Sequence, residues 1–476
     1  MDKKHILVVG GGITGLTSAY YLQKEIKEKN LPYSITLIEK SDRLGGKIST
    51  EVLDGFVIEK GPDSFLARKQ AIIDLSLELG LEDQLVGTNP RARKNYILYR
   101  NKLHIMPPGL ILGIPTKLGP FIKTGLISPL GKLRAAMDLV IPAKKEEDDE
   151  SLGGFLQRRL GKEVAENIAE PLLSGIYAGD TQNLSLNATF PQFKAVERKY
   201  GSIVKGMIGS RKAGMGARQP QLNVPPVAKQ SMFLTFKNGL QTLVERLVNS
   251  LDLVQIEKNQ AIKDFFLDEH GYRIILHDKR ELKADAIILA TPTYATKELL
   301  KDLDTASLLE EITYVSVANV VLGYRREDLE YPLDASGFVV PRKEGRNITA
   351  CTWTSSKWLH TSPEDQVLFR CYIGNSHEQD LVDLPDEELV KVVQKDLLSI
   401  MGVKATPLFR RVTKWIDAMP QYRVGHLERL NKLRKELESM RPGLFLAGSG
   451  YFGVGIPDCI QQGKDAANQL IRHLEK

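Results

Sequence analysis

The sequence predicts an α/β protein in which a parallel-sheet domain is assembled from separate stretches of the chain and interrupted by long insertions. Three observations predict this fold class. The apolar run in HILVVGGGITGL passes through a glycine-rich turn into a helix-like segment, as a buried parallel strand followed by a helix does. The strand-like GLFLAGS and a final helical segment repeat that order near residue 450. Between them, four segments rich in β-branched residues alternate, which predicts a separate antiparallel sheet.

The first turn has the pattern G-x-G-x-x-G, formed by Gly10, Gly12 and Gly15. Gly10 permits the tight turn, Gly12 lets a pyrophosphate approach the backbone, and Gly15 lets helix and strand pack closely. The second strand, SITLIEK, carries Glu39, which follows Gly15 by 24 residues and can accept hydrogen bonds from ribose hydroxyls. Together these features predict a dinucleotide site; a glycine turn beside an incidental surface glutamate is the competing interpretation.

The segment EKSDRLGGKIST follows directly. Its pattern E-x-x-x-R-x-G-G offers positive charge at Arg43 and Lys47, while Gly45 and Gly46 admit close backbone approach. The pattern resembles the second dinucleotide signature of the flavin amine oxidase superfamily, which implies FAD as the cofactor. EKGPDSF resembles the next conserved turn of that superfamily, where backbone groups face the flavin, although an ordinary Gly-Pro loop has the same composition.

The remaining segments predict discontinuous domains. NYILYRNKLHIMP has the pattern of a short hairpin, residues 100–200 are largely helical in composition, and 209–230 lack periodicity and predict a loop. FKNGLQTLVERLVNSL predicts a helix, and short strands follow it up to ILATP. We expect a cofactor-binding domain of 1–70, 230–295 and 411–476, a substrate-binding domain of 71–95 and 296–410, and a helical insertion of 96–225.

Composition limits the functional classes. With 476 residues, 42% of them hydrophobic, the chain is expected to be a multi-domain globular protein, and no apolar run reaches the roughly 18 residues of a membrane span. MDKKHILVV enters a strand-like run at once, so we expect no signal peptide and a cytoplasmic location. The net charge of +6 is dispersed, which argues against nucleic acid and favours an acidic small molecule or an anionic lipid surface. Three cysteines without a CxxC pair predict neither a disulfide framework nor a metal site.

Five motifs extend the resemblance over nearly the whole chain: GGGITGL, EKGPDSFLARK, AEPLLSGIYAGD, WIDAMPQYRVGH and YFGVGIPDCIQQGK. The chain resembles the protoporphyrinogen and coproporphyrinogen oxidases of heme biosynthesis, and most closely their Gram-positive branch, which oxidises coproporphyrinogen III. The resemblance implies a glutathione-reductase-type, FAD-binding Rossmann domain with a mixed or antiparallel sheet in the substrate domain and a helical insertion.

The same resemblance implies the reaction. Coproporphyrinogen III is oxidised to coproporphyrin III, six electrons leave in three hydride transfers to the flavin, and dioxygen is reduced to hydrogen peroxide. Protoporphyrinogen IX is the alternative substrate, and another flavin amine oxidase or desaturase activity is a more distant alternative. A nucleotide-binding protein without enzymatic activity can use the same scaffold.

Site residues are carried over from the family position by position. No catalytic side chain and no metal ligand is expected, because the flavin supplies the chemistry and the protein positions the substrate. The expected cofactor contacts are Gly10, Gly11, Gly12, Ile13, Thr14, Gly15, Glu39, Lys40, Arg43, Gly46, Lys47, Gly61, Pro62, Asp63, Ser64, Ala261, Trp415, Gly448, Gly455 and Ile456. The expected substrate contacts are Arg68, Lys69, Ile176, Gly337, Val339 and Tyr372.

Two regions leave alternatives open. Plant and animal relatives carry an arginine before the aromatic residue of the hairpin, to which a substrate propionate is attributed, and here Asn95 stands in that position. Nearby cations can replace it or can serve as solubilising surface charge: Arg68, Lys69, Arg93 and Lys94. Residues 104–143 match a family region proposed to contact membranes, and a lid over the substrate cavity explains the same composition. An enzyme of the heme pathway is a further expected partner.

The motif YFGVGIPDCIQQGK places Cys459 one turn into an expected helix, a setting that lowers the pKa of a thiol. We interpret Cys459 as a small buried residue, with a reactive thiol as the alternative. Pro457 suits the first helical turn, and the glycines before it keep side chains away from a flat ring. The motif therefore predicts a flavin seat.

Overall fold

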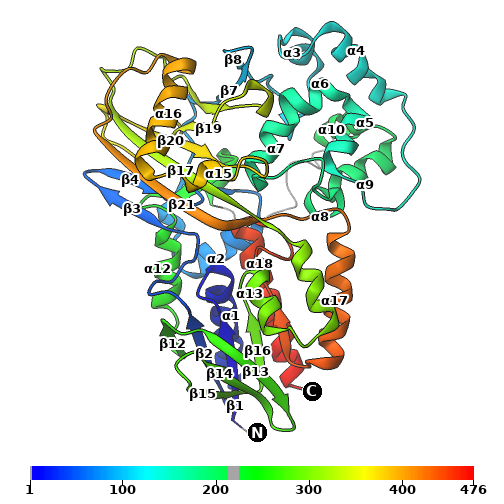
Figure 1. Ribbon diagram of the computed structural model, residues 1–476, viewed down its shortest axis with the longest axis vertical. Coiled ribbons are helices and arrows are strands. Elements are labelled where there is room, and N and C mark those ends of the chain that lie inside the picture. The colour runs from blue at the N-terminus through cyan, green and yellow to red at the C-terminus, as the bar shows by residue number, and fades with distance from the viewer. Residues whose placement is uncertain (1–2, 213–224) are drawn as a thin grey trace.

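The computed structural model describes residues 3–212 and 225–476, and its first sheet is five-stranded and parallel, in the order β12-β2-β1-β16-β22 (Figure 1). Its strands come from the beginning, the middle and the end of the chain, as predicted: β1 (Lys4–Val9), β2 (Tyr33–Glu39), β12 (Val254–Lys258), β16 (Ala286–Leu289) and β22 (Leu444–Leu446). Apolar runs form these strands because helices or further strands cover both faces of the sheet.

The helix α1 (Ile13–Lys29) follows the glycine turn and ends at Asn30, whose left-handed conformation (φ 52°) closes the helix. It packs against α18 (Ile456–Leu474), and Gly463 permits this contact because a Cβ there would lie 2.6 Å from the carbonyl oxygen of Thr14. The helices α2 (Gln70–Glu78) and α12 (Gln241–Asn249) join the same core. The expected domain division grouped residues 71–95 with the substrate-binding domain, whereas α2 packs with the parallel-sheet domain.

The second sheet has seven strands in the order β21-β17-β20-β19-β18-β7-β8 and is antiparallel except where β18 pairs with β7. The strands are β7 (Lys94–Tyr99), β8 (Lys102–Ile105), β17 (Tyr314–Arg325), β18 (Ala335–Val339), β19 (Ile348–Trp353), β20 (Gln366–Ile373) and β21 (Phe409–Pro420). One face packs on α16 (Asp386–Met401). The predicted hairpin and the four alternating segments are all present, and β21 carries the sheet past the expected boundary at 410.

A helical insertion forms the third part of the molecule, at the upper right of Figure 1. Its helices are α3 (Leu118–Lys123), α4 (Pro129–Ala136), α5 (Leu152–Leu160), α6 (Lys162–Val164), α7 (Glu170–Tyr177), α8 (Leu186–Thr189), α9 (Pro191–Tyr200) and α10 (Ile203–Lys212). The short helix α11 (Pro226–Gln230) follows, and its Val227 and Ala228 pack against the core of the parallel-sheet domain. The expected loop at 209–230 is therefore helical at both ends, and its residues 213–224 lie outside the described part of the chain. Hydrophobic packing explains the helix at its start, since α10 begins before residue 209 with Ile203 and Val204 buried in the insertion core, and Met207 and Ile208 pack against that core.

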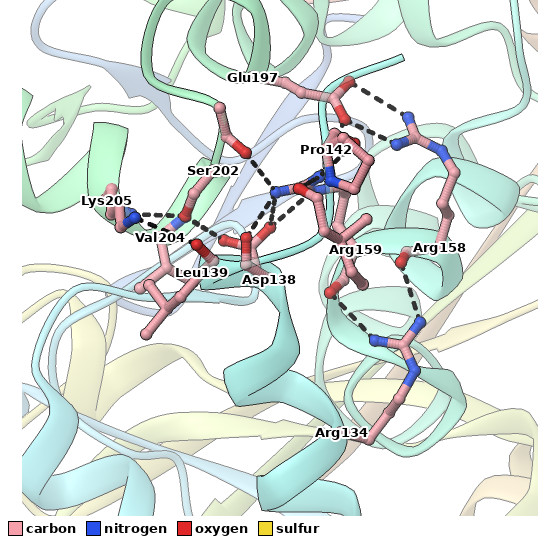
Figure 2. A network of polar contacts seen from close by, with 12 residues as sticks. Arg134, Asp138, Leu139, Pro142, Arg158, Arg159, Glu197, Ser202, Val204 and Lys205 are labelled. Carbon is pink, nitrogen blue, oxygen red and sulfur yellow. Dashed lines mark hydrogen bonds and ion pairs between the residues drawn. The ribbon is translucent and has the colours of Figure 1, made fainter.

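A buried ion network fixes the centre of the insertion (Figure 2). The side chains of Arg159 and Asp138 are both fully buried and form an ion pair of 2.5 Å. Asp138 also accepts a hydrogen bond from the backbone N–H of Val204 at 2.9 Å, and Arg159 donates to the carbonyl oxygen of Gly201 at 2.9 Å. Because a buried charge is costly unless its partners are satisfied, the network ties the chain on both sides of α5 into one arrangement.

Smaller elements complete the fold. An antiparallel sheet of β13 (Ile262–Asp268), β14 (Gly271–Leu276) and β15 (Glu281–Ala284) matches the predicted series of short strands. The short strands are β3 (Thr50–Leu53), β4 (Phe56–Glu59), β5 (Phe65–Leu66), β6 (Leu85–Gly87), β9 (Leu110–Ile111), β10 (Ile114–Pro115) and β11 (Phe233–Phe236). The remaining helices are α13 (Thr293–Leu299), α14 (Thr354–Lys357), α15 (Asp380–Asp383) and α17 (His426–Met440). Within 3–212 and 225–476, no helix has the length and apolar character needed to span a bilayer.

Candidate active site

One cavity of about 3320 Å³ is lined by residues of both large sheets and of the helical insertion. Small-molecule pockets typically measure 300 to 1,000 Å³, so this cavity has room for a large cofactor and a substrate together. Among the expected cofactor and substrate contacts, all but Gly11, Gly15 and Arg43 line it. The structure therefore brings the predicted cofactor and substrate residues to a single site.

The glycine turn and Glu39 form one end of the cavity. The Glu39 carboxylate accepts hydrogen bonds from the backbone N–H of Gly11 at 2.6 Å and of Ser41 at 2.8 Å, which hold it at the end of β2 with lone pairs left for another donor. The atom nearest to a Cβ placed at Gly12 would be the Cα of Gly46, at 4.0 Å. The space beside Gly12 is thus open to a ligand.

The three predicted residues outside the lining act on the backbone of this end. A Cβ at Gly15 would lie 1.9 Å from the carbonyl oxygen of Gly10, and one at Gly11 would lie 2.5 Å from the Leu44 side chain, so both positions require glycine for close packing. The Arg43 guanidinium donates to the carbonyl oxygens of Ile48, at 3.2 Å, and of Gly46. Arg43 therefore braces its own loop instead of facing the cavity.

Three side chains of the second sheet hold the turn that follows β4. Asn319 donates to the carbonyl oxygen of Glu59 at 3.0 Å, Trp415 donates through Nε1 to Lys60 at 2.8 Å, and Arg370 donates to Gly61 at 2.6 Å. Gly61 is required here, because a Cβ would lie 2.0 Å from the carbonyl oxygen of Lys47. The turn predicted to face the flavin is thus fixed to strands β17, β20 and β21.

Asp63 in this turn belongs to an ion cluster that the sequence does not indicate. Its carboxylate lies 2.9 Å from Lys357 Nζ and 3.5 Å from Arg370 Nη1, and Ser64 Oγ donates to it at 2.7 Å. Burial by itself would raise the pKa of Asp63, but the two cations outweigh it and hold that pKa well below its usual range. Lys357 and Arg370 lie far from Asp63 in the chain, and the only signal is an arginine within the apolar strand QVLFRCYI.

The other end of the cavity is largely apolar. Ile176 on α7 is exposed to it, as are Val339 on β18 and Tyr372 on β20. The Tyr372 ring lies 5.4 Å from the Arg370 guanidinium, and burial raises the pKa of its hydroxyl, so the ring stays neutral. Gly337 is required because a Cβ would lie 2.1 Å from the carbonyl oxygen of Cys351. Further apolar lining comes from the insertion: Leu110, Ile111, Leu112, Leu172 and Phe190.

Cations rim this apolar chamber. Arg68, Lys69 and Arg93 line the cavity, as does Lys229 of α11. Lys69 forms an ion pair with Asp458 at 2.6 Å, whereas Arg93 makes no ion pair within the described part of the chain. Lys94, the fourth predicted cation, does not line the cavity and instead pairs with Asp334 at 2.6 Å.

The C-terminal motif forms the wall between the two ends. Gly448 has φ 135°, and a Cβ there would meet nothing within 4 Å, so a second open cradle faces the cavity. Gly455 caps α18, with Pro457 in its first turn. Burial raises the pKa of the Cys459 thiol to about 11, which keeps it protonated at neutral pH and fits the interpretation of a small buried residue.

These features fit a flavin adenine dinucleotide. The open backbone at Gly12 lies beside a helix N-terminus, as a pyrophosphate requires, and Glu39 offers acceptors for a ribose. Lys40 and Ala261 extend the lining beyond Glu39. The turn at Gly61 and the cradle at Gly448 admit a flat ring system farther along the same cavity.

Comparisons with known proteins agree with this geometry. The family described as flavin containing amine oxidoreductase matches residues 13–471. The chain is 45% identical to the coproporphyrinogen III oxidase of Bacillus subtilis (strain 168), over 99% of both chains, and 39% identical to that of Staphylococcus aureus (strain NCTC 8325 / PS 47), over 99% of this chain and 100% of the relative. A crystal structure from Exiguobacterium sp. 255-15, provisionally named protoporphyrinogen oxidase, superposes with a TM-score of 0.87 at 36% identity and full coverage of both chains. The chain belongs to the flavin-containing amine oxidoreductase family and, within it, to the family of the coproporphyrinogen III oxidases.

Proposed function

We propose that this protein is an FAD-dependent, oxygen-dependent oxidase that converts coproporphyrinogen III to coproporphyrin III in heme biosynthesis. The observation that carries the proposal is the cavity of about 3320 Å³, in which a dinucleotide cradle continues into an apolar chamber with a cationic rim. The names of the relatives at 45% and 39% identity support the same substrate. Protoporphyrinogen IX, which has two carboxylates instead of four, is the alternative.

The chain's own residues position and shield the substrate. FAD held between the turn at Gly12 and the cradle at Gly448 would supply the hydride acceptor for each of three rounds, with dioxygen as the terminal oxidant and hydrogen peroxide as its product. Ile176, Val339 and Tyr372 offer apolar faces to the porphyrinogen macrocycle, and residues 110–112 cover it from the insertion side and exclude water. The clamp on Gly61 from Arg370 fixes the turn against which the flavin is proposed to lie.

The purified protein tests this function directly. We expect a yellow preparation with a flavin spectrum that turns over coproporphyrinogen III faster than protoporphyrinogen IX. A colourless protein that cannot take up FAD would contradict both the porphyrinogen oxidase hypothesis and the alternative of another flavin amine oxidase or desaturase. Equal or reversed turnover rates for the two porphyrinogens would contradict the substrate assignment.

Carboxylate recognition is proposed to reside in the cationic rim. Arg93 lines the chamber and makes no ion pair among the described residues. It can therefore bind a substrate carboxylate without breaking an existing ion pair. Arg93→Gln is expected to raise the KM for coproporphyrinogen III about tenfold with kcat little changed, since a hydrogen bond to a charged group contributes about 1.5 to 3 kcal/mol. Lys94→Gln is the matched control, because Lys94 is paired with Asp334 outside the cavity. Equal KM values for the two variants would remove Arg93 from the site.

We propose that residues 104–143 serve both of the roles that the sequence leaves open. Leu110 to Leu112 line the cavity as a lid does, whereas α3, α4 and the following turn carry apolar side chains that are 40% to 78% exposed: Leu118, Ile122, Leu130, Leu133, Met137, Leu139 and Val140. Lys117 and Lys123 stand on either side of the two apolar residues of α3. This face lies at the upper end of the molecule, opposite the start of β1 (Figure 1). We propose that it makes a peripheral contact with anionic membrane.

Vesicle flotation tests the membrane contact. The protein is expected to float with vesicles that contain anionic phospholipid, and the double variant Leu130→Ser, Leu133→Ser is expected to remain at the bottom. Leu359→Ser is the control, because Leu359 is 70% exposed on another part of the surface. Wild-type protein that stays at the bottom with every vesicle composition would refute the contact.

A further inference from the structure

Tyr422 lies in the connection between β21 and α17, where the helical insertion meets the C-terminal loop. Its side chain is fully buried and does not line the cavity. The connection is bonded to the insertion by its backbone, since Ser185 N–H donates to the Tyr422 carbonyl oxygen at 2.7 Å and Val424 N–H donates to that of Asn183 at 3.2 Å. Tyr422 thus occupies a junction between two walls of the cavity.

The Tyr422 hydroxyl joins the two sides of the loop 448–455. It donates to the carbonyl oxygen of Ser449 at 2.5 Å and accepts from the N–H of Gly453 at 2.9 Å. Burial keeps the pKa of this hydroxyl well above its ordinary value, so it retains the proton that the Ser449 bond requires. Because Gly448, Ser449 and Gly455 line the cavity, the hydroxyl sets the shape of the second open cradle.

His426 supports the same arrangement from behind. Its ring stacks on Tyr422 with centroids 4.3 Å apart and an angle of 19° between the planes. Its Nε2 donates to the carbonyl oxygen of Tyr451 at 2.8 Å, and Tyr451 lies in the middle of the loop 448–455. Burial lowers the pKa of His426 to about 4, so the ring is neutral near pH 7 and carries its proton on Nε2.

On its other side, the connection contacts the wall on α7. The Tyr422 ring meets the edge of the Tyr177 ring at 5.7 Å, and the neighbouring Gln421 donates through Nε2 to the carbonyl oxygen of Tyr177 at 2.8 Å. Ile176, the preceding residue of α7, is exposed to the cavity. The Tyr422 side chain therefore contacts both α7, through its ring, and the loop 448–455, through its hydroxyl.

We propose that Tyr422 is a positioning residue that couples the substrate wall on α7 to the cofactor loop 448–455, so that a porphyrin against α7 tightens the hold on FAD. The inference rests on the proposed function, since it takes the loop as part of the FAD site. Coupling between two ligands is reciprocal, so it is measurable as an effect of porphyrin on FAD affinity.

The test is FAD affinity of the full-length protein with and without coproporphyrin III, measured as flavin retained after ultrafiltration at a series of dilutions. Wild type is expected to hold FAD at least about fivefold more tightly with the porphyrin, at the lower end of common coupling strengths. Tyr422→Phe is expected to bind FAD about tenfold more weakly, and its porphyrin effect is expected to fall below twofold. Tenfold corresponds to about 1.4 kcal/mol, near the cost of a lost buried hydrogen bond.

Tyr272→Phe is the matched control, because Tyr272 is a buried tyrosine that donates to the carbonyl oxygen of Pro442 at 2.9 Å away from the cavity. It is expected to keep wild-type FAD affinity and the full porphyrin effect. Gln421→Met is the second variant, and it removes the bond to α7 together with a local bond to the carbonyl oxygen of Met419 at 3.0 Å, while the Tyr422 hydroxyl bonds to the loop stay intact. Its FAD affinity without porphyrin is expected to stay within twofold of wild type while the porphyrin effect is lost.

Several results would overturn the inference. They are a wild-type protein whose FAD affinity ignores the porphyrin, Tyr422→Phe and Gln421→Met variants that keep the full effect, and a Tyr272→Phe variant that loses it equally. A wild-type protein that binds no FAD would overturn the proposed function itself, which separates the two failures.

Discussion

Glu59, at the end of β4, gives a prediction whose size follows from the structure. Its carboxylate is buried and accepts hydrogen bonds from Leu240 N–H at 2.6 Å and from Thr50 Oγ1 at 2.9 Å. Burial raises the pKa of Glu59 to about 7, against the lowering effects of the Leu240 bond and of the nearby Arg370 charge. The ordinary value is 4.5. Between these pH values the folded protein therefore retains a proton that the unfolded chain has released.

The sign and size of the effect follow from linkage. Because the folded state binds more protons than the unfolded state between pH 4.5 and 7, the free energy of unfolding falls as pH rises through this range. At 1.36 kcal/mol per pH unit, the loss between pH 5 and pH 8 is about 2.5 kcal/mol. His426 acts in the opposite direction below pH 6.5, since burial lowers its pKa to about 4. The contribution of Glu59 is thus seen by comparing wild type with Glu59→Gln at each pH.

Urea unfolding followed by tryptophan fluorescence measures this difference. Glutamine keeps the shape of the side chain and an acceptor for the N–H of Leu240. The variant should therefore lose the pH-dependent contribution of Glu59 to the free energy of unfolding and little else. Relative to wild type, the variant is expected to gain about 2.5 kcal/mol between pH 5 and pH 8 with an unchanged m value. Glu245→Gln, at an exposed position on α12, is the control. A Glu59→Gln variant that parallels wild type across this range would show that the carboxylate is not held neutral.

Three further predictions concern other parts of the molecule. Asp138→Asn is expected to destabilise the protein by about 1.5 to 3 kcal/mol in urea unfolding, because it removes one of the two carboxylates that pair with the buried Arg159, and to expose the insertion to limited proteolysis; an unchanged unfolding midpoint would contradict this. Gly61→Ala is expected to abolish FAD retention in gel filtration, since its Cβ would lie 2.0 Å from the Lys47 carbonyl oxygen, and a fully loaded variant would refute the required close approach. Cys459→Ala is expected to keep both the flavin spectrum and turnover, and loss of turnover with FAD still bound would restore the reactive-thiol alternative.

The features that the sequence predicts well depend on neighbouring residues. The apolar run before Gly10 and the alternation in β17 and β20 set strand type locally, and the structure contains each of them. The glycine spacing likewise predicts the open cradle at Gly12, because close backbone approach is a property of the turn itself.

Features that depend on distant contacts were not accessible from the sequence. The clamp on Asp63 joins a turn near residue 60 to Lys357 at the end of α14 and to Arg370 in β20, and no local pattern connects them. The placement of α2 depends on which apolar faces meet: Ile72, Ile73 and Leu75 are buried with the parallel-sheet core, so the helix follows that layer. Arg43 has the residue type expected for a phosphate contact, yet the carbonyl oxygens of its own loop satisfy its guanidinium.

The parallel sheet contains strands from both ends of the chain, and this has a consequence during synthesis. The buried face of α1 is covered by α18, and the cradle at Gly12 shares its cavity with Gly455. Since translation proceeds at about 5 to 20 residues per second, roughly 20 to 90 s pass between the appearance of α1 and that of α18. During this interval the nascent chain has an uncovered apolar helix and an incomplete cofactor cavity. Loading of the cofactor is therefore a late event that follows the last helix, and removal of that helix would eliminate the site rather than leave a smaller one.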